Sequence, residues 1–256
     1  AWTQAIVGVP AKELLIICSD YAVEALRNLL GLCGEQVTVR RFERKQHVEL
    51  LPAPVSLHAL KKGDAVVAFS RRDVLMLRDQ ASADGTPVSV IYGALPPEVR
   101  RREAERFAQG ESHILIATDA IGMGLNLPVR RVLFSTLTKF DGQGDRALTE
   151  SEVHQIAGRA GRYLNDGTFG VTGDATQLDE GLIDAIENHR FAPISRLMWR
   201  NGVLEFGNPE RLVASLETMP QSEWLARGRE ADDLQALKAL AATPDIRDQV
   251  THPRDV

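Results

Sequence analysis

Between residues 64 and 171, short apolar runs alternate with longer segments in which apolar positions recur every three or four residues. The runs predict buried strands, because a strand covered on both faces is apolar throughout, and the longer segments predict amphipathic helices. We expect strands at 65–69, 88–91, 114–117, 132–134 and 167–171, and helices at 71–83, 97–109 and 155–163. Strands separated by helices of this length indicate an α/β fold with a parallel sheet and right-handed crossovers.

The segments before and after this alternation have a different pattern. Ahead of it we expect a strand at 13–18, a helix at 21–32 and a strand at 36–42, followed by a proline-containing stretch at 51–54 that indicates a domain boundary. Beyond residue 174 the spacing is helical, at 178–189, 209–219 and 232–242. We therefore divide the chain into residues 1–54, residues 55–175 and a helical region at 176–256, whose end we expect to fray.

Composition restricts the class of protein. The 256 residues are 44% hydrophobic and 25% charged, as in ordinary soluble proteins, and no apolar run is long enough to span a membrane. Cys18 and Cys33 lack the spacing of a metal site or a disulfide framework, so we expect no metal, and we expect Cys18 to be buried. The net charge of −5 argues against a protein coated in nucleic acid but leaves room for a local basic groove.

Residues 151–162 carry the strongest candidate chemistry. The segment reads Ser-Glu-Val-His-Gln-Ile-Ala-Gly-Arg-Ala-Gly-Arg. On a helix, Arg159 and Arg162 would share a face, and the small Gly158 and Gly161 would let that face approach a ligand closely. Guanidinium groups are suited to a bidentate grip on phosphate oxygens. An amphipathic helix with two exposed arginines and no ligand is the structural alternative.

A second segment, residues 114–128, supports the phosphate interpretation. Its apolar strand ends in Thr118 and Asp119, and Gly122 and Gly124 follow, so that backbone amides there could face a ligand. In open α/β sheets, ligands bind beyond the carboxyl ends of the strands. A single Gly-x-Gly is weak evidence, but its combination with the later Gln-x-x-Gly-Arg-x-Gly-Arg segment is specific.

These two segments resemble motifs V and VI of superfamily-two helicases, which lie in the second RecA-like domain. Ala-Thr-Asp-Ala-Ile-Gly-Met-Gly-Leu-Asn-Leu at 117–127, with the segments 66–73 and 90–97, is similar to the mitochondrial-degradosome type RNA helicases and their bacterial relatives. The resemblance implies a RecA-like domain at 55–175, preceded at 1–54 by a remnant of the first RecA-like domain and a linker. It implies part of an ATP-dependent helicase that acts on RNA, with DNA as the alternative, in which this chain supplies the motif IV, V and VI half of the cleft that binds ATP and nucleic acid.

The roles of single residues follow only from this resemblance. Arg162 matches the arginine finger, Arg159 a second γ-phosphate contact and Gln155 a polar group near the attacking water. Further nucleotide contacts are implied for Gly124, Asn126, Asp119 and Gly158. Nucleic-acid contacts are implied for Thr118, Ser70, Arg71 and Gly93.

The stretch from 139 to 150 is polar and rich in glycine, and its turn residues suit a hairpin. In related helicases a hairpin at this place lies near the duplex junction. Lys139 and Arg146 are therefore candidate nucleic-acid contacts, and a plain solvent-exposed loop is the alternative.

The parts that would cradle the ATP phosphates and hold Mg²⁺ are absent from this sequence. It contains neither a Gly-x-x-x-x-Gly-Lys-Ser/Thr loop nor an Asp-Glu-x-His or Asp-Glu-Ala-Asp box. We therefore expect the missing first RecA-like domain to hold ATP and Mg²⁺, and we expect this chain alone to be inactive as an ATPase. The resemblance, together with the lack of a basic leader, predicts a bacterial cytoplasmic monomer, and only the resemblance implies a ribonuclease partner.

Two other interpretations remain. The chain could be a helicase-derived module that binds nucleic acid or protein without catalysis. It could also be an unrelated doubly wound α/β enzyme that binds a dinucleotide or sugar phosphate. The second would need a Gly-x-Gly-x-x-Gly turn after its first strand, which the sequence lacks.

Overall fold

In the structure, a computed structural model, the contacts between residues divide the chain into two compact units. One unit combines Ala1–Arg41 with Ala192–Val256, and the other is Phe42–Phe191. The structure describes residues 2–42, 47–122, 127–142, 144–161, 166–173, 175, 177–188, 192–228 and 232–247. This division groups the two ends of the chain, whereas the sequence pattern predicts three consecutive parts. Each unit is therefore described by itself.

The central feature of the second unit is a six-stranded parallel sheet, which confirms the predicted fold class. Its strand order is β1-β8-β5-β2-β4-β3. The strands are β1 (Val48–Leu50), β2 (Asp64–Val67), β3 (Val88–Ile91), β4 (Ile114–Ala117), β5 (Arg131–Phe134) and β8 (Gly167–Val171). Strand β1 was not predicted, because it is only three residues long and lies at the sheet edge with one buried side chain.

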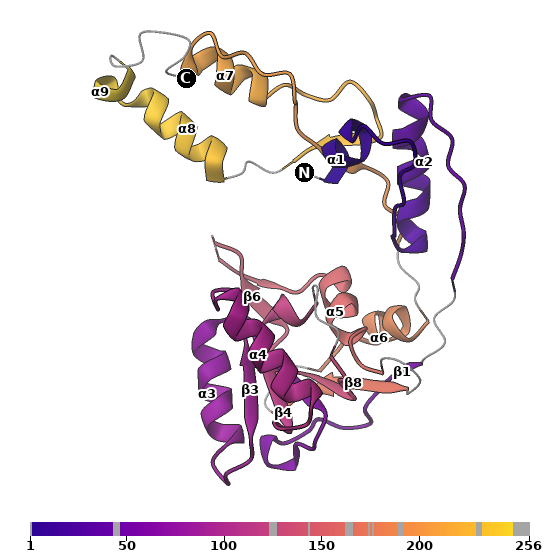
Figure 1. The fold of residues 1–256 in the computed structure, drawn as a ribbon, viewed down its shortest axis with the longest axis vertical. Coiled ribbons are helices and arrows are strands. Elements are labelled where there is room, and N and C mark those ends of the chain that lie inside the picture. Colours follow the sequence, from indigo (N-terminus) through magenta and orange to yellow (C-terminus); the bar gives the residue numbers. More distant parts are fainter. Residues whose placement is uncertain are drawn as a thin grey trace. The chain divides into compact units, whose positions relative to one another are not determined.

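Helices cover both faces of this sheet (Figure 1). The order of the strands in the sheet differs from their order in the sequence, so the connecting helices fall on different faces. Helix α3 (Arg71–Ala81) packs Val74 and Leu77 on the face that carries Val66. The opposite face, which carries Val67, is covered by α4 (Pro97–Ala108), α5 (Glu150–Ala157) and α6 (Glu180–Glu187). Neighbouring residues of β2 thus enter two different cores, as the alternation of side chains along a strand requires.

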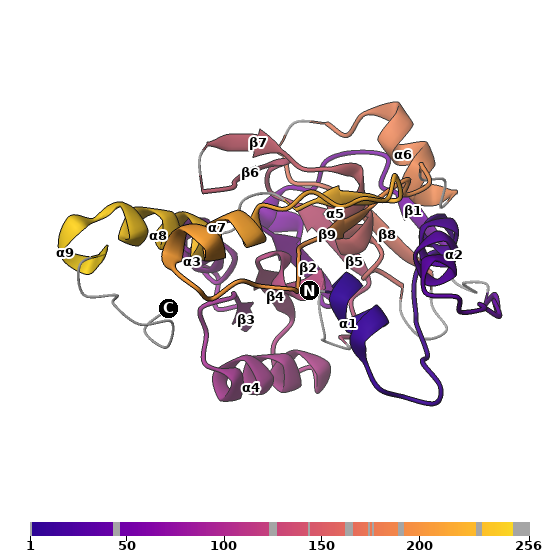
Figure 2. The same ribbon diagram turned by 90° about the horizontal axis from the view of Figure 1, so that it is seen from above.

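Shorter elements connect the strands and main helices. The single-turn helix η2 (Leu57–Ala59) precedes β2, and η3 (Asp119–Gly122) follows the carboxyl end of β4. Strands β6 (Thr138–Phe140) and β7 (Asp145–Ala147) pair antiparallel, which confirms the predicted hairpin (Figure 2).

At the amino ends of the strands, β2 and β5 are joined by a buried ion pair. Asp64, 1% exposed, accepts a hydrogen bond from Arg131 Nε at 2.7 Å and another from the backbone N–H of Lys61 at 2.6 Å. Burial of a carboxylate is tolerated only with such compensation, and the carboxylate in turn raises the pKa of Arg131. This pair ties β2 to β5 at the amino ends of the strands.

The first unit joins the two ends of the chain. Thr3 Oγ1 donates to the carbonyl of Met198 at 2.5 Å, and the N–H of Ile194 donates to the carbonyl of Tyr21 at 2.9 Å. Strands β9 (Leu197–Trp199) and β10 (Leu225–Arg227) form a parallel pair. The helices are α1 (Trp2–Gly8), η1 (Asp20–Ala22), α2 (Val23–Leu32), α7 (Pro209–Leu216), α8 (Asp232–Ala242) and α9 (Pro244–Arg247). No described helix is both long and apolar enough to cross a bilayer.

The strands predicted at 13–18 and 36–42 are absent from the structure. Leu15 is 91% exposed, Ile17 is fully exposed and Cys18 is exposed rather than buried. An apolar run forms a strand only where a neighbouring strand satisfies its backbone groups, and no described strand pairs with these segments. The interpretation of residues 1–54 as a remnant of a first RecA-like domain stays a prediction.

Candidate functional site

The candidate site lies along the carboxyl edge of the sheet, where β2, β3 and β4 end. Ser70 is the N-cap of α3, the helix that follows β2. Its hydroxyl accepts from the N–H of Asp73 at 3.0 Å and donates to the Asp73 carboxylate at 2.6 Å. The cap explains why a helix starts here, since it satisfies one of the free N–H groups of the first turn. It also fixes the position of the Ser70 side chain.

Arg71, Gly93 and Thr118 follow the carboxyl ends of the same strands, at the edge where Ser70 lies. The guanidinium of Arg71 lies 5.5 Å from the centre of the Tyr92 ring, within range of a cation–π contact. The carbonyl of Gly93 accepts from Arg100 at 2.7 Å. The N–H of Thr118 donates to the carbonyl of Ile91 at 2.9 Å, which joins the ends of β4 and β3. Four of the predicted nucleic-acid contacts therefore share one edge.

The segment after β4 folds into η3 through local hydrogen bonds. Thr118 Oγ1 accepts from the N–H of Ala120 at 3.3 Å, and the Thr118 carbonyl accepts from the N–H of Ile121 at 3.0 Å. The Asp119 side chain is half exposed. Gly124 and Asn126, the predicted nucleotide contacts beyond η3, lie outside the described residues.

Helix α5 ends earlier than the sequence predicts. The helix stops at Ala157, and Gly158 donates its N–H to the carbonyl of His154 at 2.7 Å. Gly161 has φ of 68°, a left-handed conformation that a helix does not contain, and its N–H donates to the carbonyl of Val129 at 3.1 Å. The prediction that the helix continues past Ala157 is therefore wrong at 158–161, and the predicted shared face of Arg159 and Arg162 is not tested, because Arg162 lies outside the described residues.

The motif VI residues are instead divided between α5 and a turn. Gln155 is exposed on α5, and the half-buried Arg159 is in the turn at 158–161. Both take part in polar interactions. Arg162 lies outside the described residues.

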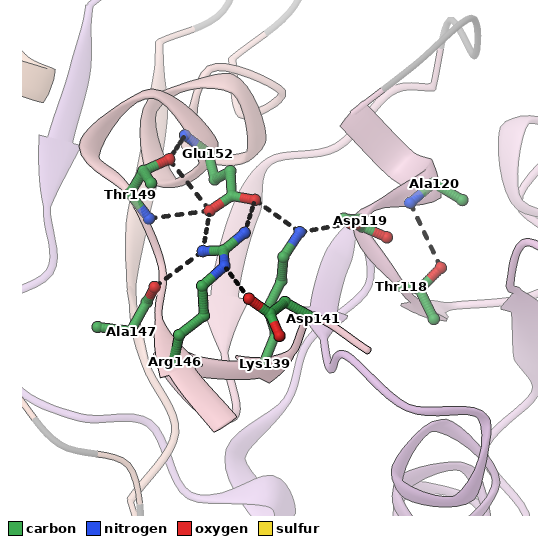
Figure 3. A network of polar contacts seen from close by, with 9 residues as sticks. All are labelled: Thr118, Asp119, Ala120, Lys139, Asp141, Arg146, Ala147, Thr149 and Glu152. Atoms are coloured by element: carbon green, nitrogen blue, oxygen red, sulfur yellow. Dashed lines mark hydrogen bonds and ion pairs between the residues drawn. The ribbon is translucent and has the colours of Figure 1, made fainter. Parts of the chain in front are cut away.

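The β6–β7 hairpin is bound to the start of α5 by ion pairs (Figure 3). Glu152 accepts from Lys139 Nζ at 2.6 Å and receives two bonds of 2.9 Å from the guanidinium of Arg146. Its carboxylate also accepts the N–H and hydroxyl of Thr149, while the Thr149 hydroxyl accepts the N–H of Glu152. Arg146 contributes most to holding the pKa of Glu152 far below its ordinary value, with Lys139 and Thr149 adding to the effect.

The predicted contacts Lys139 and Arg146 thus have carboxylate partners within this unit. Lys139 also approaches Asp119 at 3.5 Å, and Arg146 approaches Asp141 at 3.8 Å. Sequence reasoning overlooked Glu152, although Thr149-x-x-Glu152 has the spacing of a capping box. The contacts from Lys139 and Arg146 depend on the fold and had no signal in the sequence.

A groove of about 490 Å³ lies between the hairpin and α3. Its walls combine hydroxyl groups, such as that of Ser70, with apolar side chains that include Met76 and Phe140. Among the residues that the structure describes, no group of three or more His, Cys, Asp or Glu could hold a metal ion.

Comparison with known proteins agrees with this geometry. Residues 46–164 match the family described as the helicase conserved C-terminal domain. The chain is 38% identical over 202 residues to the mitochondrial ATP-dependent RNA helicase SUV3 of Saccharomyces paradoxus, covering 77% of this chain and 27% of that protein. It is 45% identical over 168 residues to the mitochondrial DExH-box ATP-dependent RNA helicase DExH16 of Arabidopsis thaliana, covering 64% of this chain and 29% of that protein.

The chain therefore spans little more than a quarter of the length of these relatives. A solved structure of S. cerevisiae Dbp5 bound to RNA and ADP BeF3 has a TM-score of 0.50 and 16% identity, covering 75% of this chain and 52% of that chain. At this identity the likeness concerns the fold alone.

The relatives contradict the predicted location and confirm the predicted family. They are named as mitochondrial and come from eukaryotes, so the prediction of a bacterial cytoplasmic protein is wrong. The lack of a basic leader did not indicate the location of the protein, because that observation concerns only the residues of this sequence. With a parallel RecA-like sheet, the family match over 46–164 and relatives that are degradosome-type RNA helicases, the chain carries the C-terminal domain of a superfamily-two helicase of the degradosome type.

Proposed function

We propose that this chain supplies the motif IV, V and VI half of the cleft in an ATP-dependent RNA helicase. The observation that carries the proposal is the placement of η3 and the turn at 158–161 in one unit, within the region that matches the helicase family. The names of the relatives support RNA as the nucleic acid.

In this proposal the chain acts on ATP held by another lobe. Phosphoryl transfer to water requires a phosphate cradle, a metal ion, a group that orients the water and a cation near the developing charge. This sequence lacks the cradle and the metal-binding box, and the described residues form no metal cluster. ATP and Mg²⁺ would therefore be held mainly by a first RecA-like domain, and this chain alone would not hydrolyse ATP.

The proposed contribution of this chain is electrostatic. Arg162 would reach the γ-phosphate as an arginine finger, Arg159 would make a second phosphate contact, and Gln155 would lie near the attacking water. An arginine in this role is worth on the order of a thousand-fold or more in rate. Gly124, Asn126, Asp119 and Gly158 would lie around the nucleotide.

The proposed strand contacts are sequence-independent. Thr118, Ser70, Arg71 and Gly93 share one edge of the sheet and offer hydroxyl groups, a backbone and a guanidinium to a sugar–phosphate chain. Contacts of this kind set position and affinity without reading bases, and they make binding depend on salt. A ribonuclease partner and a monomeric state are further proposals, and only the resemblance supports them.

The experiment compares ATP hydrolysis with and without single-stranded RNA, for this chain alone and for the chain joined to a phosphate-binding RecA-like domain. We expect RNA-stimulated hydrolysis only in the joined form. RNA binding without hydrolysis in the joined form would favour the alternative, a catalytically inactive binding module. Strong ATP hydrolysis by this chain alone would contradict the proposal that another RecA-like domain must hold ATP and Mg²⁺.

A further inference from the structure

Lys139 has an unusual position between the two segments that carry the proposed ATPase residues. Its ammonium group lies 2.6 Å from a carboxylate oxygen of Glu152, at the start of α5, and 3.5 Å from one of Asp119, at the start of η3 (Figure 3). The side chain is 19% exposed. One cation on the hairpin therefore joins the motif V segment to the helix that leads into motif VI.

On the basis of the proposed function, we propose that Lys139 is a positioning residue that keeps η3 and α5 in register for ATP hydrolysis and does not itself grip the nucleic acid. Apolar contacts beneath the ion pairs already join the two elements. Ile121 of η3 and Val153 and Ile156 of α5 belong to one buried cluster. Lys139 adds a directional contact at the surface of that cluster.

The local charge opposes a direct grip on phosphate. Two cations, Lys139 and Arg146, face three carboxylates, those of Asp119, Asp141 and Glu152. A phosphate that approached Lys139 would meet these carboxylates and would have to replace the 2.6 Å contact to Glu152. Arg71, in contrast, has an aromatic ring beside it and is exposed, so it is the better candidate for phosphate.

The link to catalysis is geometric. Helix α5 has only eight residues, so a shift at Glu152 is passed to the turn that contains Arg159. Asp119 is itself a proposed nucleotide contact and begins η3, so a shift of η3 moves it directly. Displacements of about 1 Å in a positioning group can reduce rates by about a hundred-fold.

The first test compares Lys139→Met, which keeps the length of the side chain, with Arg71→Ala. Binding of a fluorescent single-stranded RNA is measured over a series of salt concentrations. We expect Lys139→Met to leave the affinity within about two-fold and the salt slope unchanged, whereas loss of a phosphate contact at Arg71 lowers the slope by about 0.7. A lowered slope in Lys139→Met would show a direct phosphate contact and overturn the proposal.

The second test measures RNA-stimulated ATP hydrolysis in the chain joined to a phosphate-binding RecA-like domain. We expect Lys139→Met to lower kcat by about ten-fold or more without changing the RNA concentration for half-maximal stimulation. Lys139→Arg, which keeps the cation, should restore most of the rate. An unchanged kcat, or a loss that Lys139→Arg does not restore, would overturn the proposal.

A third measurement separates this proposal from the proposed function. Hydrogen exchange of this chain alone should be faster in 119–122 and 150–157 in Lys139→Met and unchanged in α4. If the wild-type joined protein showed no RNA-stimulated hydrolysis, the proposed function would fail. The exchange result would still decide whether Lys139 holds the two segments, and unchanged exchange in both would overturn that claim.

Discussion

Gly167, the first residue of β8, lies directly against the backbone of Gly161 in the motif VI turn. A methyl group at Gly167 would overlap the backbone of Ala160 and Gly161. The close approach holds the turn against the sheet, where the N–H of Gly161 donates to the carbonyl of Val129 at 3.1 Å. The position of Arg159 thus depends on a glycine that the motif does not include.

Replacing Gly167 by alanine should therefore displace the turn. We expect Gly167→Ala to lower the free energy of unfolding by about 1–3 kcal/mol, because the surrounding backbone must move to admit the methyl group. Urea denaturation measures the effect. Gly173→Ala is the matched control, since a methyl group there meets nothing within 4 Å. Equal stability of the two variants would contradict the close approach.

The Asp64–Arg131 pair should contribute stability, since it ties β2 to β5 at the amino ends of the two strands. Asp64→Ala should cost about 3 kcal/mol, because it leaves a partly buried guanidinium without its carboxylate. Asp79→Ala, which removes an exposed partner of Arg78, should cost less than about 1 kcal/mol. Urea midpoints of the two variants check this difference, and a loss for Asp64→Ala as small as that of the control would refute it.

The Glu152 carboxylate should make stability depend on pH in the acid range. Its pKa in the folded protein is lower than the ordinary value of 4.5, so its contribution to stability is complete above that pH and declines as the pH falls towards the folded value. Glu152→Gln should therefore be clearly less stable than the wild type at pH 7, by about 1 kcal/mol or more. The difference should shrink as the pH falls below 4.5.

Denaturation of the wild type and Glu152→Gln at several pH values between about 3 and 7 measures this effect. Glu49→Gln, on β1, is a control variant from which no such trend is expected, since Glu49 is exposed and forms no ion pair with another described residue. A stability difference for Glu152→Gln that stayed constant across this range would exclude the ion-pair origin.

The sheet could be predicted from the sequence because its strands are buried on both faces. The bounds of β3, β4 and β8 agree with the predicted ones to the residue, since each is a short run between turn residues. The same reasoning failed at 13–18, where an equally apolar run remains exposed coil. Composition reports the tendency to form a strand, but the partner strand decides whether it forms.

The site was predicted less completely, because its geometry depends on contacts between distant residues. The motif sequence located Arg159 but not the end of α5, which depends on the left-handed Gly161 and on Gly167 beside it. Turn residues predicted the hairpin, yet the partners of Lys139 lie 20 and 13 positions away along the chain. Spacing along the chain could not reveal that two predicted nucleic-acid contacts share one carboxylate.

The most direct test of the account is ATP hydrolysis by this chain joined to a phosphate-binding RecA-like domain, with Arg159→Ala and Arg162→Ala introduced separately. Arg101→Ala, an exposed arginine on α4, is the control. We predict that both site variants bind ATP about as well as the wild type while RNA-stimulated turnover falls by a thousand-fold or so for Arg162→Ala, and that the control keeps its activity. Turnover by Arg162→Ala equal to that of the wild type would contradict the claim that this chain supplies the catalytic cation.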